Sequence, residues 1–86
     1  MSAPSTTQSL KLAFPIRHAG KEITEVAIRR PKVADVIAAQ RGASTPGEIE
    51  LAMVAQIVGL PQDAVAQMDL ADYMAIQAAL KAMAGG

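Results

Sequence analysis

Apolar and polar residues alternate near the start of the chain, at the two-residue spacing that places side chains on one face of a strand. The first such run has apolar residues at Leu10, Leu12, Phe14 and Ile16, and the second has Thr24, Val26 and Ile28. Between them, His18 to Lys21 forms a turn signal, because Gly20 tolerates positive φ. The pattern predicts a β-hairpin with strands at 10–17 and 22–30, and Pro15 indicates an edge position because it lacks an amide hydrogen.

After Pro31 the apolar period changes to that of helices. A first helix is predicted over 32–41 with Gly42 at its end, and a second over 46–58, where Thr45-Pro46-Gly47-Glu48 has the order of a capping box. A short helical turn over 61–66 and a last helix over 70–83, capped by Asp69, complete the chain. The fold class predicted is therefore α+β: an N-terminal β-hairpin followed by a bundle of three to four short helices. Residues 10–84 form one domain, and the polar residues 1–9 a disordered tail.

The composition changes this picture by limiting the core. Apolar residues make up 51% of the 86, but there is one Phe, one Tyr and no Trp, and a chain this short hides only about 60% of its unfolded surface. The 46–58 helix is apolar around most of its circumference, which is typical of a helix covered on two sides. We infer that part of the apolar surface is covered by another chain.

The charge is unevenly distributed although the net charge is zero. Residues 1–42 hold seven cations and three anions, a net +4, and residues 43–86 hold Lys81 and five anions, a net −4. Three of the cations, Arg29, Arg30 and Lys32, gather where strand changes to helix. Two interpretations stay open: ordinary solvated faces, or attraction between copies or to a partner of alternating charge.

Catalytic, cofactor and metal sites find little support. The single histidine, His18, is predicted at a turn tip, the chain has no cysteine, and Asp69 and Asp72 are explained as helix-start residues. Residues 42–47 lack the spacing of a phosphate-binding loop. Nucleic-acid binding is disfavoured because the 46–58 helix carries two glutamates and no cation. A membrane span is disfavoured because the longest apolar run, 51–60, is half of the roughly 20 residues needed, and residues 1–9 lack the features of a signal peptide.

Several short motifs, in order, resemble those of the tail assembly chaperone family, of the E and 41 type, from Mu-like and P2-like contractile-tailed phages. The resemblance covers about residues 10–80. It is carried mainly by Ile28-Arg29-Arg30-Pro31 with the following Asp35, and by Gly59-Leu60-Pro61 with the later Met68-Asp69-Leu70-Ala71-Asp72-Tyr73.

The resemblance implies a chaperone that is not an enzyme and has no cofactor. Its expected partner is the tape measure protein through helical segments, with the tail tube protein as a further partner through a frameshifted longer form. The expected location is the cytoplasm of the bacterial host, outside the mature virion.

Our hypothesis for partner binding combines an apolar groove with orienting cations. The groove would lie on the second and last helices and use Leu51, Val54, Val58, Leu60, Tyr73 and Met74, while Arg29, Arg30 and Lys32 would orient acidic positions of the partner. The competing hypothesis is a structural or regulatory module that associates with itself as a homo-oligomer through its two charged halves.

Overall fold

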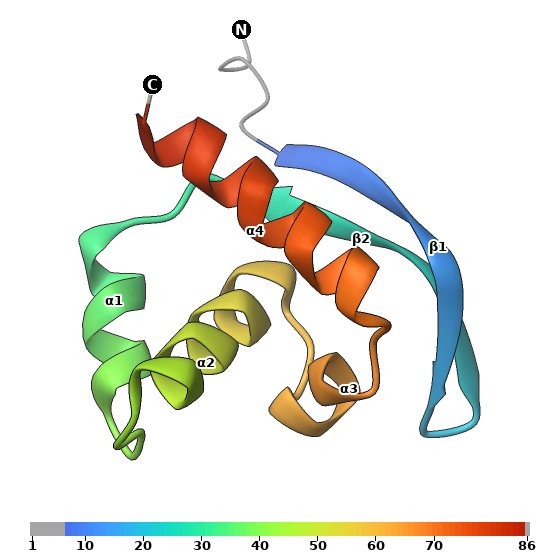
Figure 1. The fold of residues 1–86 in the computed structure, drawn as a ribbon, viewed down its shortest axis with the longest axis horizontal. Coiled ribbons are helices and arrows are strands. Elements are labelled where there is room, and N and C mark those ends of the chain that lie inside the picture. Colours follow the sequence, from blue (N-terminus) through green and yellow to red (C-terminus); the bar gives the residue numbers. More distant parts are fainter. Residues whose placement is uncertain (1–6, 86) are drawn as a thin grey trace, which may run out of the picture.

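The structure, a computed structural model, describes residues 7–85 and consists of a β-hairpin followed by four helices (Figure 1). The strands are β1 (Thr7–His18) and β2 (Lys21–Arg29), and the helices are α1 (Val33–Gln40), α2 (Pro46–Val58), α3 (Gln62–Ala66) and α4 (Leu70–Gly85). The α+β class and the order of elements predicted from the sequence are confirmed.

The hairpin is antiparallel and closes through a two-residue turn. His18 pairs with Lys21, and both residues between them have positive φ, 53° at Ala19 and 80° at Gly20, as in the turns whose twist matches that of the two strands. The strand β1 begins at Thr7, which pairs with Arg29, so residues 7–9 belong to the hairpin and not to the predicted tail. The rest of that predicted tail, residues 1–6, lies outside the described residues.

An irregularity in β1 changes which of its side chains face the core. Lys11 pairs with Glu25, but the next pair is Ile16 with Ile23, so four residues of β1 lie opposite one of β2. Leu12 and Ile16 are buried, as predicted, whereas Phe14 is 55% exposed. The prediction that Phe14 shares the buried face is therefore wrong, because a bulge shifts the alternation of side chains.

A carboxylate from the last helix stabilises this bulge. Asp72, in the first turn of α4 and buried, accepts hydrogen bonds from the backbone N–H groups of Ala13 (2.9 Å) and Phe14 (3.0 Å). These amides do not pair with β2 in the irregular segment, so Asp72 satisfies donors that the bulge leaves without a strand partner. The contact fixes the start of α4 against β1.

The helix ends follow their sequence signals closely. Thr45 accepts from the Glu48 N–H, and the Glu48 carboxylate accepts from the Thr45 N–H, which confirms the capping box of α2. At the other end Gly59 has φ 73° and its N–H donates to the Ala55 carbonyl. Asp69 accepts from the Ala71 N–H at 2.9 Å, and this bond caps α4.

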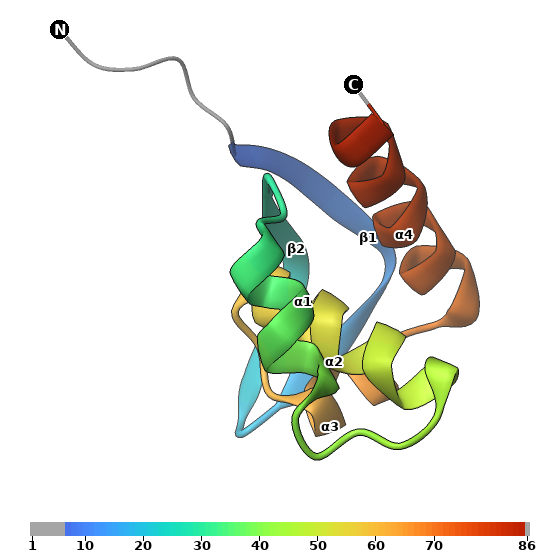
Figure 2. The ribbon, with the colours of Figure 1, turned by 90° about the vertical axis from the view of Figure 1, so that its left-hand side faces the viewer.

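The core lies between the hairpin and the helices, which gather on one side of it (Figure 2). Its largest fully buried side chains are Ile28 from β2, Val54 from α2, Val65 from α3 and Ile76 from α4. Each element except α1 supplies one or more members of the core cluster. Helix α1 instead packs beside α2, and its large apolar side chains are exposed.

Candidate functional site: a groove between α2 and α4

The junction between β2 and α1 is held by an internal ion pair. The two guanidinium nitrogens of Arg29 donate to the two carboxylate oxygens of Asp35 at 2.8 and 2.6 Å, and the Lys32 N–H donates to the same carboxylate at 2.8 Å. Asp35 is 4% exposed, and the hydrogen bonds from Arg29 lower its pKa from 3.8 to about 2. Arg29 is therefore paired with Asp35 within the chain. Of the three cations predicted to orient a partner, only Arg30 and Lys32 are exposed and outside this ion pair.

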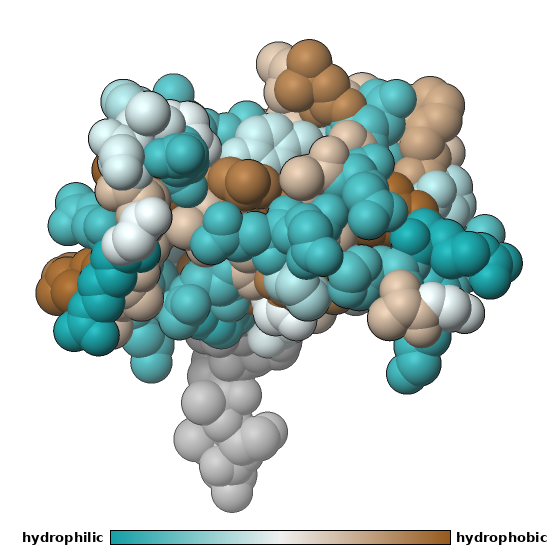
Figure 3. All heavy atoms as spheres, turned by 90° about the horizontal axis from the view of Figure 1, so that it is seen from below, coloured by the Kyte–Doolittle hydropathy of each residue, from teal (hydrophilic) through white to brown (hydrophobic). Residues whose placement is uncertain are grey.

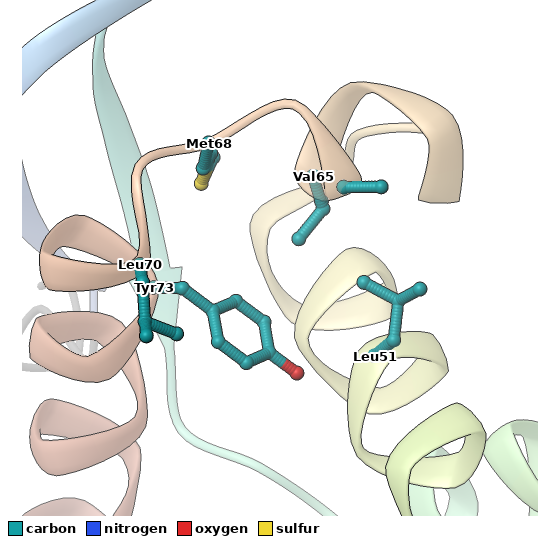
Figure 4. A pocket seen from close by; sticks show the side chains of 6 residues that line it. Leu51, Val65, Met68, Leu70 and Tyr73 are labelled. Atoms are coloured by element: carbon teal, nitrogen blue, oxygen red, sulfur yellow. The ribbon is translucent and has the colours of Figure 1, made fainter.

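An apolar pocket of about 280 Å³ opens between the middle of α2, the end of α3 and the beginning of α4. Figure 4 shows Tyr73 of α4 pointing across toward Leu51 of α2, with Val65 and Met68 above the ring and Leu70 beside it. Partial burial raises the pKa of the Tyr73 hydroxyl above its usual value. The ring thus offers an apolar face to the pocket while its hydroxyl stays protonated at neutral pH.

A second apolar pocket, of about 320 Å³, continues along the same two helices. Its lining comes from the β2–α1 junction, α2 and α4: Pro31, Glu50, Met53, Val54, Gln77, Leu80, Lys81 and Ala84. Gln77 lies one helical turn after Tyr73, and its amide donates to the Glu50 carboxylate, which links α2 to α4 in the lining of the second pocket. We call the two pockets together the α2/α4 groove.

The structure brings some of the predicted groove residues together and separates others. Leu51 and Tyr73 both line the first pocket. Val54 is 1% exposed, so it forms the floor of the second pocket and belongs to the core. Leu60 lines a different and more polar pocket at the end of α2, and Val58 packs against the core cluster. Met74 is exposed but lines neither pocket of the groove.

A family model described as phage tail assembly chaperone proteins, E, or 41 or 14, matches residues 9–85 of the chain. The chain belongs to this family. The match extends slightly beyond the 10–80 over which the motifs resemble it, and it confirms that resemblance. The searches of curated proteins and of solved structures give no match.

Among residues 7–85 no group of three or more His, Cys, Asp or Glu is placed to hold a metal ion. The two aspartates at the start of α4 are engaged with backbone amides. In the same part of the chain, no helix combines the length and apolar character needed to cross a membrane.

Sequence reasoning missed several groove residues. Met53, Leu70 and Leu80 line the pockets, and Pro31 closes the end nearest the β2–α1 junction. Met53 and Leu80 belong to apolar sides of helices that also supply core residues. Helical spacing alone therefore does not distinguish a residue that lines a pocket from one that belongs to the core. Pro31 comes from another element, and only the tertiary structure places it beside α4.

Proposed function

We propose that this tail assembly chaperone binds helical segments of the tape measure protein in the α2/α4 groove and keeps them soluble during tail assembly. The observation that supports the proposal is the pair of apolar pockets that are both lined by α2 and α4. A long client helix with an exposed apolar stripe would self-associate, and a groove that covers the stripe would prevent this. The proposed activity is binding, with no chemical step.

The dimensions of the groove suit a helix of a few turns. The pocket-lining residues of α4 run from Leu70 to Ala84, which at 1.5 Å per residue is about 21 Å and matches three to four turns of a client. Two pockets along that length would receive apolar side chains about one to two turns apart, at the i, i+3/i+4 and i+7 positions of the client. The Gln77–Glu50 contact would face the backbone of the client helix, between the two apolar side chains that enter the pockets.

The charges around the groove suit one orientation of the client. Arg30 and Lys32 flank Pro31 at one end, where Lys81 also lines the second pocket. Asp69 precedes Leu70 at the other end. A client segment with acidic residues at the Pro31 end and basic residues at the Leu70 end would bind in register, and the rim charges would act mainly on the association rate.

Co-expression with the tape measure protein of the same phage tests the proposal. The expected result is that the chaperone raises the soluble fraction of the tape measure protein and co-purifies with it, and that Leu51→Asp and Tyr73→Asp each abolish both effects. Ala75→Asp is the matched control, since it places the same charge on an exposed position of α4 outside the pocket linings. Equal solubility of the tape measure protein with and without the chaperone would refute the proposal.

The same proposal includes the remaining partners and the location. A frameshifted longer form would recruit the tail tube protein, and the chaperone would act in the cytoplasm of the bacterial host and leave before the virion is complete. Mass spectrometry of purified virions and of infected lysates provides the test. Peptides of this chain are expected in lysates and not in virions.

A further inference from the structure

Two apolar faces of the described residues remain uncovered and carry opposite charge; one lies outside the α2/α4 groove, and the other shares Leu70 with the first pocket. The first, the α1 face, consists of Val33 (76% exposed), Val36 (39%) and Ile37 (52%), which share one side of α1. The second, the α4 face, consists of Leu70 (68%) and Met74 (58%), one turn apart on α4. In Figure 3, hydrophobic surface occurs in separate places on a largely hydrophilic side of the molecule.

The α1 face has a cationic rim. Residues 30–42 contain Arg30, Lys32 and Arg41, all exposed, and one anion, Asp35. That anion is buried and bonded to Arg29, so it does not offset the charge of the exposed cations at the surface. A partner for this face should therefore offer apolar side chains beside carboxylates.

The α4 face meets this description. Residues 62–80 contain three aspartates and no lysine or arginine. Asp72 is buried against β1, which leaves Asp63 and Asp69 exposed near Leu70 in the chain. The two faces do not meet within one molecule, because α1 and the first turn of α4 lie well apart in Figure 1, and Figure 2 shows α1 separate from α4 as well.

We propose that the α1 face of one copy docks on the α4 face of a second copy, with Arg30, Lys32 and Arg41 near Asp63 and Asp69 of the second copy. Such a contact joins two different surfaces, so a bound pair leaves one α1 face and one α4 face free, and the assembly grows head to tail or closes into a ring. The contact is small and therefore weak, in the micromolar to millimolar range. Because Leu70 also lines the first pocket, a docked copy would cover that end of the groove.

Sedimentation velocity on the purified chain alone tests this contact, so the result does not depend on tape measure binding. The wild type is measured from about 10 µM to about 1 mM, the range that such a weak contact requires. Its average mass is expected to rise with concentration, and less steeply at high salt. Ile37→Asp and Met74→Asp should each lower the association constant roughly tenfold or more. Ala34→Asp on α1 and Ala75→Asp on α4, equal in charge but outside the faces, should change it less than threefold.

Mixing the two interface variants distinguishes this contact from a symmetric dimer in which two α1 faces or two α4 faces meet. Ile37→Asp retains an intact α4 face and Met74→Asp an intact α1 face, so an equimolar mixture should form a heterodimer at concentrations where each variant alone is monomeric. If either variant loses helical circular dichroism, Ile37→Gln or Met74→Gln replaces it. A wild type that stays monomeric, association that neither variant weakens, or a mixture that stays monomeric would each overturn the proposal.

Discussion

Replacing Asp35 with Asn removes the charge that holds the β2–α1 junction while keeping the shape of the side chain. The carboxylate accepts two hydrogen bonds from Arg29 and one from the Lys32 N–H. Its pKa falls from 3.8 to about 2 in the folded state. At about 1.4 kcal/mol per pKa unit, this shift sets an upper limit of roughly 2.5 kcal/mol for the stabilisation by the charged form.

Solvent reduces this limit because the two partners differ in exposure. The Asp35 side chain is 5% exposed, but the Arg29 side chain is 38% exposed, so the guanidinium regains water when the pair is broken. We therefore expect Asp35→Asn to lower the free energy of unfolding by roughly 1–2 kcal/mol at pH 7. For a domain of this size each kcal/mol corresponds to a fall in Tm of about 4–8 °C.

The difference in free energy of unfolding between the wild type and Asp35→Asn should be large at neutral pH and decrease at low pH. Because the folded pKa of Asp35 lies below the unfolded one, its stabilisation is complete above about pH 4. It is lost as the pH falls through 3.8 toward about 2. Urea unfolding followed by circular dichroism at pH 7 and at about pH 2 measures the difference directly, since all other carboxyl groups are common to both proteins.

Asp63→Asn provides the matched control, because Asp63 is an exposed aspartate in the first turn of a short helix. Its effect should stay within about 0.5 kcal/mol. An Asp35→Asn protein as stable as the wild type at pH 7, or one whose deficit persists unchanged at about pH 2, would show that the buried carboxylate does not stabilise the junction through its charge.

Three further changes test other parts of the fold. Asp72→Ala should cost about 1–3 kcal/mol, because it leaves the N–H groups of Ala13 and Phe14 without an acceptor; urea unfolding measures the loss, and faster hydrogen exchange at these two amides should accompany it. Ala19→Asn should stabilise the hairpin by roughly 0.5–1 kcal/mol, since Ala19 has φ 53° and Asn tolerates this region better; an unchanged or lower Tm would contradict this. Thr45→Ala should cost about 1 kcal/mol through loss of the α2 cap, whereas the exposed Thr24→Ala should change Tm little.

Local signals explain why the order of elements could be predicted from the sequence. The Thr45 to Glu48 capping box, the glycine after α2 and the alternation of Val26 with Ile28 each depend on residues near one another in the chain, and each appears in the structure. Where a long-range contact intervened, the prediction was wrong: Phe14 is exposed because β1 bulges there. The aspartate that stabilises the bulge lies 58 residues farther along the chain.

The candidate site could be predicted only in part, for a related reason. Helical spacing selects residues on one side of a helix, but it does not show whether a neighbouring element covers that side. Val54 and Leu51 belong to the same helix and look alike in the sequence, yet Val54 is in the core and Leu51 lines a pocket. The cations Arg29 and Arg30 are adjacent, and only the structure shows that Asp35 engages the first.

The distribution of burial also explains why so small a chain can leave several apolar surfaces open. The core draws on β1, β2, α2, α3 and the inner side of α4, while α1 contributes the buried Asp35 and Ala39. The Arg29–Asp35 pair and the contact with α2 position α1 without burying Val33 or Ile37. The Arg29–Asp35 pair and the burial of Ala39, a small side chain, thus hold α1 in place. The apolar side chains Val33, Val36 and Ile37 of α1 therefore remain exposed, and the β2–α1 junction depends on the buried carboxylate of Asp35.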